Sequence, residues 1–138
     1  MKALMKAALA VYIFLYRLTR GAVGGRMAGL QVLLLTTTGR KTGQLRTTPL
    51  GYFTQNGNYV VIASNGGADQ NPAWFYNLKS NPQVTLQIGN KQVAANAEVV
   101  DTKKRKQMWA DLVKMAPAYD RYTTRTKREI PLVILKPV

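Results

Sequence analysis

The stretch VLLLTTTGRKTGQLRTTPLGYF, residues 32–53, contains the pattern from which the fold can be predicted. Its first part, 32–38, is a short apolar and β-branched run, which is typical of a buried strand. Residues 45–53 resume an extended pattern, in which Pro49 indicates a sheet edge or a bulge. The stretch therefore predicts two neighbouring strands joined by the glycine-bounded turn GRKTG.

Short turn signals separate further extended runs on the C-terminal side of this stretch. The dipeptide NG at 56–57 is a strong hairpin signal. The remaining strands are expected at residues 59–64, 84–88, 92–100 and 130–135. Two helices are expected, one at 72–79 after an Asn71 N-cap and one that begins near Thr102, whereas 117–128 is expected to be irregular. About six strands joined by hairpins, with helices at the margins, predict an α+β domain built on an antiparallel sheet or a small barrel.

The composition restricts the chemistry that the chain can perform. Its 138 residues are enough for one domain with a single core. Cys and His are absent, which excludes disulfides, thiol nucleophiles, Ser-His-Asp triads and Cys or His metal sites. The six acidic residues are scattered, so a two-carboxylate glycosidase or an oxygen-ligated metal site is poorly supplied. An enzyme of this composition needs a bound cofactor to carry the chemistry, and we expect no metal.

The charge balance is strongly positive. Lys and Arg total 20 against 6 Asp and Glu, which gives a formal net charge of +14. An excess of this size indicates an anionic partner, such as a phosphate-bearing ligand, a nucleic acid or a membrane surface. A basic nucleic-acid-binding module is therefore one alternative to an enzyme, because small barrels also bind single strands.

The N-terminal segment has the pattern of an amphipathic helix with basic ends. Residues 3–16 are apolar except for one lysine. Four basic residues fall on one helical face: Lys2, Lys6, Arg17 and Arg20. The uninterrupted apolar run 7–16 would be about 15 Å long as a helix, roughly half the hydrocarbon thickness of a bilayer, so it cannot span one. Residues 2–20 can either lie in a membrane interface or pack on the domain with their lysines extended to solvent; a secretory signal is disfavoured because no clean cleavage site follows.

Positive charge is concentrated in the turn of the opening stretch. Arg40 and Lys41 lie between two glycines, Thr42 adds a hydroxyl, and Arg46 follows at the start of the next strand. These side chains and the backbone amides near the glycines predict a concave cationic loop for a phosphate or carboxylates. The spacing is not that of a Walker loop. The alternative is a solvated hairpin turn with incidental charges.

Two further groups of residues are candidates for contact with a flat ligand or its substrate. Ser64 ends a strand before a Gly-Gly loop, and Trp74 and Asn77 follow on the next expected helix, so backbone amides and a ring surface would come together there. In the alternative interpretation, Trp74 is a core residue. Tyr119 and Tyr122 are among the few proton donors available in a chain without His, although tyrosines in a polar stretch are often amphipathic surface residues.

These segments together resemble the deazaflavin-dependent nitroreductase family of actinobacteria, which uses coenzyme F420 and includes the F420H2-dependent quinone reductases. The resemblance runs from about residue 32 to 137 and is most specific in three separated stretches. They are LLLTTTGRKTGQLRTTPL, ASNGGADQNPAWFYNLKSNPQV and APAYDRYTTRTKREIPLVIL. It implies a split β-barrel of the FMN-binding type at residues 31–138, preceded by the N-terminal helix and a flexible glycine-rich connection at 1–30.

The resemblance also implies roles for individual residues. The phosphate and oligoglutamate tail of the coenzyme would be held by Arg40, Lys41, Thr42 and Arg46. The deazaflavin ring would be surrounded by Pro49, Ser64, Trp74 and Asn77. Tyr119 and Tyr122 would line the substrate side. The chain departs from well-known members at Asn65, where they carry Lys, and at Ala116, where they carry Tyr, so the reduction of nitroimidazoles cannot be transferred to it.

The expected activity is that of an oxidoreductase. A hydride would pass from the reduced deazaflavin to a quinone or to an activated alkene or nitro acceptor, with Tyr119 or Tyr122 protonating the acceptor and Ser64 hydrogen-bonded to the ring. An FMN-dependent oxidoreductase is the alternative, because the phosphate of FMN would suit the same loop. With a small-molecule acceptor as partner, no nucleic acid is expected. We expect a cytoplasmic protein, peripheral on the inner face of the cell membrane.

Overall fold

The opening stretch folds into two long paired strands. In the computed structural model, which describes residues 2–138, β2 (Leu30–Thr38) pairs antiparallel with β3 (Leu45–Gln55). Pro49 lies opposite Leu34, in a part of β3 that pairs with β2 only, so its missing N–H removes no ladder bond to a second neighbour. Of the two alternatives predicted at Pro49, a sheet edge or a bulge, the structure has the edge.

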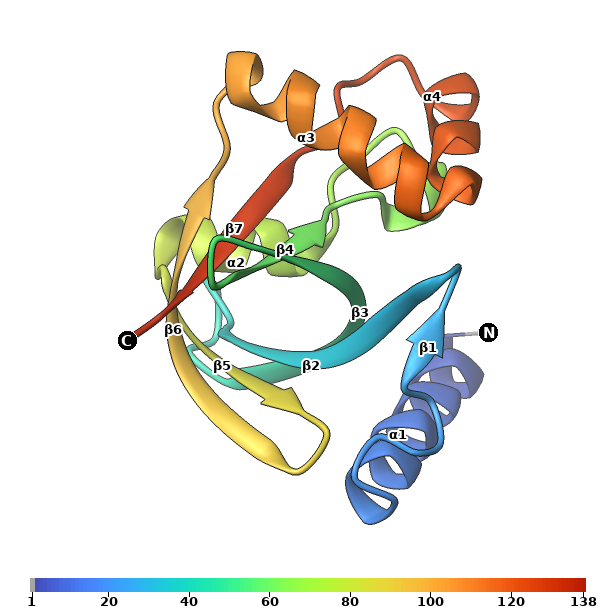
Figure 1. Ribbon diagram of the computed structural model, residues 1–138. Coiled ribbons are helices and arrows are strands. Elements are labelled where there is room, and N and C mark those ends of the chain that lie inside the picture. The colour runs from blue at the N-terminus through green and yellow to red at the C-terminus, as the bar shows by residue number, and fades with distance from the viewer. Residues whose placement is uncertain (1) are drawn as a thin grey trace.

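The strands close into an antiparallel barrel. The remaining strands are β1 (Arg26–Met27), β4 (Asn58–Ile62), β5 (Gln83–Ile88), β6 (Lys91–Val99) and β7 (Leu132–Pro137). Among residues 2–138, the sheet order is β1-β2-β3-β4-β7-β6-β5, and pairing of β2 with β5 closes β2–β7 into a ring (Figure 1). Asn56 and Gly57 both have positive φ between the paired residues Gln55 and Asn58, so the predicted two-residue hairpin is confirmed.

Apolar layers lie both inside and outside this barrel. The interior is filled from the strands and from α2 (Ala73–Ser80), which contributes Trp74, Phe75 and Leu78. The outer face of β3, β4 and β7 is covered by α3 (Thr102–Met115) and the 3-10 helix η2 (Pro117–Arg121). Figure 1 shows these helices on the opposite side of the barrel from α1 (Lys2–Leu18). The antiparallel α+β barrel that the sequence predicted is thereby confirmed.

The two predicted helices form, but α2 is not capped by the predicted residue. Pro72 is the N-cap of α2, and the Asn71 side chain instead accepts a hydrogen bond from Arg128. The N-cap of α3 is Asp101, whose carboxylate accepts from the backbone N–H of Lys104 at 2.8 Å. A carboxylate suits this position because it also interacts favourably with the positive end of the helix dipole.

Two segments are more ordered than predicted. Residues 117–128 were expected to be irregular, but they form η2 and α4 (Tyr122–Arg125). The helical turns bury Tyr119 against strand residues far away in sequence, which local polarity does not reveal. The glycine-rich connection was expected to be flexible, but it forms turns at Gly21, Gly24 and Gly29, and β1 pairs there with β2.

The N-terminal helix packs on the barrel. Tyr16 is fully buried against Val32 and Leu34 of β2, and Ile13 is partly buried beside it. The Tyr16 hydroxyl donates to the carbonyl of Val32 at 2.9 Å and accepts from the N–H of Gly89 at 2.9 Å. Within residues 2–138, no helix has both the length and the apolar character needed to cross a bilayer. The Lys2 side chain, which was predicted to lie on the basic face, is outside the described part.

We predict that Gly51→Ala destabilises the fold through Tyr119. A Cβ at Gly51 would lie 2.9 Å from the Tyr119 hydroxyl oxygen and 3.3 Å from two Leu30 side-chain atoms. Overpacking of this kind costs about 1–3 kcal/mol, measurable as a lower free energy of unfolding in urea. The penalty should shrink when Tyr119→Phe removes the hydroxyl, and equal penalties in both backgrounds would contradict the assigned contact.

Candidate functional site

One cavity brings together the N-terminal helix, the β2–β3 turn and α2. Its volume is about 870 Å³, within the range of small-molecule sites. From α1 it is lined by Leu9, Ala10, Ile13, Phe14 and Arg17. From the turn and β3 it is lined by Gly39, Arg40, Lys41, Thr42, Leu45, Arg46, Thr47 and Thr48, and from α2 by Ala73, Trp74 and Asn77. We call it the cationic pocket, and residues 39–46 the cationic loop.

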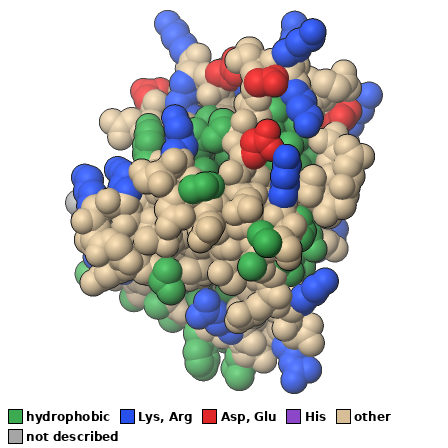
Figure 2. Space-filling model, turned by 90° about the vertical axis from the view of Figure 1, so that its left-hand side faces the viewer, with side chains coloured by type: hydrophobic (Ala, Val, Ile, Leu, Met, Phe, Trp, Pro, Cys, Tyr) green, Lys and Arg blue, Asp and Glu red, His purple; other side chains and the backbone are tan. Residues whose placement is uncertain are grey.

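The charge of this pocket has one sign. Arg17, Arg40, Lys41 and Arg46 line it, and its described lining includes no Asp or Glu. The excess of positive charge in the pocket follows from the order of residues in the sequence. The first 68 residues contain eight Lys and Arg, and all six acidic residues come later. On the face shown in Figure 2, the acidic side chains lie only in the upper half, whereas Lys and Arg lie in both halves. The pocket is therefore suited to an anionic ligand.

The cationic loop is held in shape by its own hydrogen bonds. The N–H of Gly39 donates to the carbonyl of Gln44 at 2.7 Å, and the N–H of Gly43 donates to the carbonyl of Gly39 at 2.8 Å. The Thr42 hydroxyl accepts from the N–H of Gln44 at 3.2 Å. Gly43 has a φ of +72°, a conformation that favours glycine. The prediction of a glycine-bounded turn is confirmed, and its cations project from a defined backbone.

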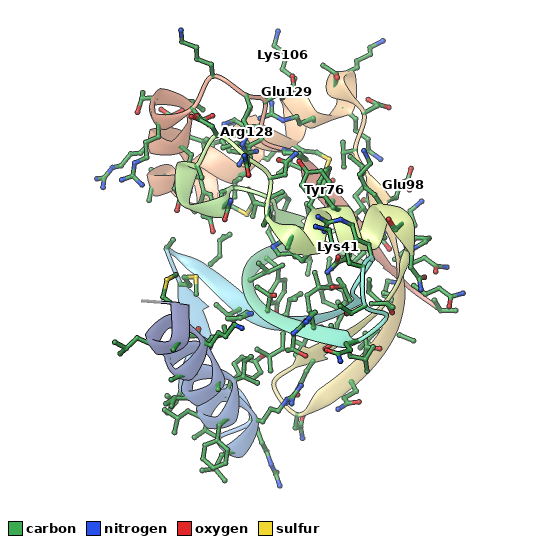
Figure 3. All side chains as sticks on the ribbon, turned by 180° about the vertical axis from the view of Figure 1, so that it is seen from behind. Lys41, Tyr76, Glu98, Lys106, Arg128 and Glu129 are labelled. Atoms are coloured by element: carbon green, nitrogen blue, oxygen red, sulfur yellow. The ribbon has the colours of Figure 1, made fainter. Side chains whose placement is uncertain are left out.

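Asn77 connects this loop to the barrel and to α2. Its buried side-chain amide nitrogen donates to the Thr37 hydroxyl at 3.2 Å. Its oxygen accepts from the backbone N–H of Arg40 at 3.1 Å and from Arg40 Nη1 at 3.3 Å. The Arg40 guanidinium also lies 5.1 Å from the centre of the Tyr76 ring, and Figure 3 shows Lys41 and Tyr76 on the same side of the molecule. The nitrogen of Asn77 thus anchors its side chain to β2, and the oxygen positions Arg40.

The other side of the pocket is apolar and comes from α1. Leu9, Ile13 and Phe14 face the cavity at helical spacing, and Trp74 lines it from α2. Arg17, one turn further along α1, donates from Nε to the Gln87 side chain at 3.2 Å. The helical periodicity identified this stripe, but only the packing of Tyr16 on β2 shows that part of it faces a cavity. This apolar wall was missed as a site component by sequence reasoning.

The other predicted site residues lie outside the lining of this pocket. Pro49 lies directly after the lining residue Thr48 on β3. Ser64 lies just after β4, where its backbone carbonyl accepts hydrogen bonds from Arg128 Nη2 and from the N–H of Gly67, each at 2.9 Å. Tyr119 and Tyr122 pack edge to face with ring centres 5.4 Å apart. The Tyr119 hydroxyl reaches β3 beside Gly51, three residues from Thr48, which is about 10 Å along a strand.

The Tyr119 hydroxyl has a perturbed acidity. Burial, and to a smaller extent the neighbouring Tyr122, raises its pKa to about 12. The ring is only 5% exposed, so the neutral phenol is strongly preferred over the phenolate. At neutral pH Tyr119 therefore holds its proton and can act only as a hydrogen-bond donor or acceptor in its neutral form.

We predict a late ionisation for Tyr119. The difference between the ultraviolet titrations of the wild type and Tyr119→Phe should show a midpoint near pH 12 rather than 10. Because the folded-state pKa is raised, the stabilisation from this group is complete below about pH 10 and is lost as the pH rises through 12. A difference titration centred near pH 10 would show that the hydroxyl is solvated.

Comparisons with known proteins are consistent with this geometry. A family model described as F420H(2)-dependent quinone reductase matches residues 10–137. An F420H(2)-dependent quinone reductase of Mycobacterium tuberculosis is 39% identical over 125 residues, which cover 88% of this chain and 84% of the relative. A solved F420-H2 dependent reductase, FDR-A, is 38% identical with a TM-score of 0.68. The match covers 76% of this chain and 93% of the FDR-A chain. Another solved structure, described as a domain-swapped dimer, is 33% identical with a TM-score of 0.72. The match covers 99% of this chain and 100% of that structure's chain.

Proposed function

Because this chain belongs to the F420H(2)-dependent quinone reductase family, we propose that its cationic pocket holds coenzyme F420 for the reduction of a quinone. Membership makes the chain an F420-dependent oxidoreductase with a quinone as acceptor, and its barrel is a split β-barrel. The family, fold, activity and cofactor predicted from sequence are confirmed. The roles of individual residues are our proposal.

The residues of the pocket fit the anionic part of this coenzyme. Three cations of one loop, Arg40, Lys41 and Arg46, line the cavity without an acidic neighbour in its described lining. They would hold the phosphate and carboxylates, with the Thr42 hydroxyl as a further hydrogen-bonding group. Each charge-assisted hydrogen bond contributes on the order of 1.5–3 kcal/mol. The proposal rests on this observation, a pocket whose described charged lining residues are all basic.

The family match decides between the coenzymes that the sequence left open, in favour of F420 over FMN. A nucleic-acid strand is also a poor match for this surface, because the loop cations converge on a cavity with an apolar wall. We expect that wall, which is formed by Leu9, Ile13 and Phe14, to shield the bound coenzyme from water.

When bound, the reduced deazaflavin supplies a hydride. The chain's own residues would orient the reactants and manage the proton. Ser64 and Pro49 are proposed to border the ring, where the Ser64 hydroxyl can hydrogen-bond its edge, and Trp74 offers a flat apolar surface. Tyr119 or Tyr122 is proposed to donate a hydrogen bond or a proton to the acceptor oxygen, which the neutral state of Tyr119 at physiological pH supports.

We predict that the loop cations dominate coenzyme affinity. In a fluorescence titration with oxidised F420, Arg40→Ala and Lys41→Ala should each weaken binding by about 10- to 100-fold, because each removes a charge-assisted contact. Asn77→Ala should have a smaller effect, since it only releases the position of Arg40. Turnover of reduced F420 with menadione then tests the activity itself.

The matched control is Lys91→Ala, which removes an exposed cation at the first residue of β6, outside the lining of the pocket. It should bind and turn over like the wild type. Unchanged affinity in both Arg40→Ala and Lys41→Ala would contradict the assignment of the loop. Absence of any F420-dependent menadione reduction by the wild type would contradict the function.

Peripheral membrane association is a separate part of the proposal. The outward face of α1 leaves apolar side chains in solvent, with Leu4 76%, Val11 56% and Leu18 67% exposed. Lys6 and Arg20 are exposed near its two ends. An apolar face with flanking cations is the pattern of a helix that lies in the interface of an anionic membrane. Such a location would place the pocket close to lipid-soluble quinones.

We predict that this face binds vesicles of mixed anionic and neutral phospholipid. In a flotation assay the wild type should rise with the vesicles, and Leu4→Ser combined with Leu18→Ser should reduce the bound fraction several-fold by removing buried apolar area. Met115→Ser, which removes an exposed apolar side chain at the end of α3, serves as the control. Equal flotation of all three proteins, or none by the wild type, would refute the interfacial role of α1.

A further inference from the structure

A single arginine organises the loop that connects β4 to α2. Arg128, in the segment between α4 and β7, donates hydrogen bonds to four acceptors of residues 63–71. Its Nε donates to the carbonyl of Ala68 at 2.9 Å, and Nη1 donates to the Asn71 side chain at 2.6 Å. Its Nη2 donates to the carbonyls of Ala63 at 3.1 Å and Ser64 at 2.9 Å. We call residues 63–71 the β4–α2 loop.

The acceptors of Arg128 are all neutral oxygens. Within the described residues, no carboxylate oxygen lies within 4.0 Å of its guanidinium. Every nitrogen of the guanidinium is already engaged with the protein, so Arg128 is not a free anion-binding group. A planar fork with five donors can satisfy several carbonyls at fixed angles, which the single ammonium of lysine cannot. The role of Arg128 is therefore geometric rather than one of charge neutralisation.

The β4–α2 loop needs such support because its backbone is unusual. Asn65, Gly66 and Gly67 are three successive residues with positive φ, and one of them carries a side chain. A non-glycine residue in this region is strained, and such backbone persists only where its surroundings hold it. Neighbours of Arg128 add weaker support: the Thr126 hydroxyl donates to Asp69 at 3.1 Å, and Arg125 donates to the carbonyl of Gly66 at 3.5 Å.

Both ends of this loop lead to proposed parts of the site. It begins beside Ser64, proposed to contact the ring, and ends at α2, which places Trp74 and Asn77 in the cationic pocket. The loop also touches the tyrosine-bearing segment, since a Cβ at Gly67 would lie 3.2 Å from Tyr122 Cδ1. Figure 3 shows Arg128 above α2, on the side of the molecule away from α1.

We propose that Arg128 is a positioning residue for the reductase reaction. By fixing the β4–α2 loop it sets the spacing between Ser64, the start of α2 and Tyr122, and so aligns the coenzyme side of the site with the acceptor side. It does not contact the reacting atoms. This inference rests on the proposed function, although its structural part can be measured without coenzyme.

The test compares Arg128→Lys, which keeps the charge but loses the fork, with the control Arg121→Lys on the exposed surface of η2. In coenzyme-free protein, amide hydrogen exchange of residues 63–71 should become about tenfold faster in Arg128→Lys, while β2 and β7 keep their protection. In a Trp109→Phe background, emission from Trp74 should shift to the red and become easier to quench. Arg121→Lys should change neither.

F420 binding and menadione reduction are then measured in the same variants, at a temperature well below their unfolding transition. Arg128→Lys should weaken F420 binding about tenfold, equivalent to about 1.4 kcal/mol, and lower kcat for menadione more than it changes KM, because misalignment acts mainly on the reacting geometry. A merely structural role would lower the melting temperature without moving affinity or kcat. Faster loop exchange with unchanged affinity and kcat, or unchanged loop exchange, overturns the proposal.

A second variant covers the case in which Arg128→Lys does not fold. Asn71→Ala removes one of the four acceptors and leaves the other three, so it should produce the same changes at about a third of their size. Wild-type values throughout in Asn71→Ala would overturn the proposal. If the wild type fails to bind F420 while exchange and Trp74 emission still respond to Arg128→Lys, the proposed function fails and the loop-fixing role of Arg128 stands.

Discussion

The arrangement of this protein depends on the confinement of β2. This strand pairs with β3 along one edge and with β5 along the other, and the second pairing closes the barrel. Its inward residues Leu33 and Leu35 fill the barrel, whereas Val32 and Leu34 are buried beneath α1. A strand covered on both faces requires a continuous apolar run rather than an alternating one. Because β2 is fixed on every side, the cationic loop that follows it starts from an immobile point.

The site is assembled around that point by polar contacts from distant parts of the chain. Asn77 of α2 joins Thr37 at the end of β2 to Arg40 in the loop, so barrel, loop and helix share one hydrogen-bonded junction. Arg128 joins the two ends of the loop that precedes α2, because it donates hydrogen bonds to both Ser64 and Asn71. A preorganised site of this kind loses little entropy when an anionic ligand binds. The cost is a concentration of like charge, which the late position of all six acids in the chain leaves uncompensated locally.

Sequence patterns predicted the strands and turns correctly where those elements depend only on residues that are close in the chain. The apolar run of β2, the turn at Asn56 and the cations between Gly39 and Gly43 depend on neighbours in sequence, and each was found as expected. The helical turns of residues 117–128 were missed because the burial of Tyr119 against β3 stabilises them. The hydrogen bonds of Asn77 to Thr37 and Arg40 could not be inferred from spacing, because these partners lie about 40 residues away in the chain.

The sequence by itself determined the class of chemistry: without His, Cys or paired carboxylates, and with a net charge of +14, the chain needed an anionic cofactor to become an enzyme. It also determined which loop would offer the positive charge, because that depends on residue type alone. Only the tertiary structure decided that Arg17 and part of the apolar face of α1 line the pocket, and that Arg128 holds the β4–α2 loop. Both outcomes depend on contacts between residues far apart in the chain, which arise only when the barrel closes and the helices pack upon it.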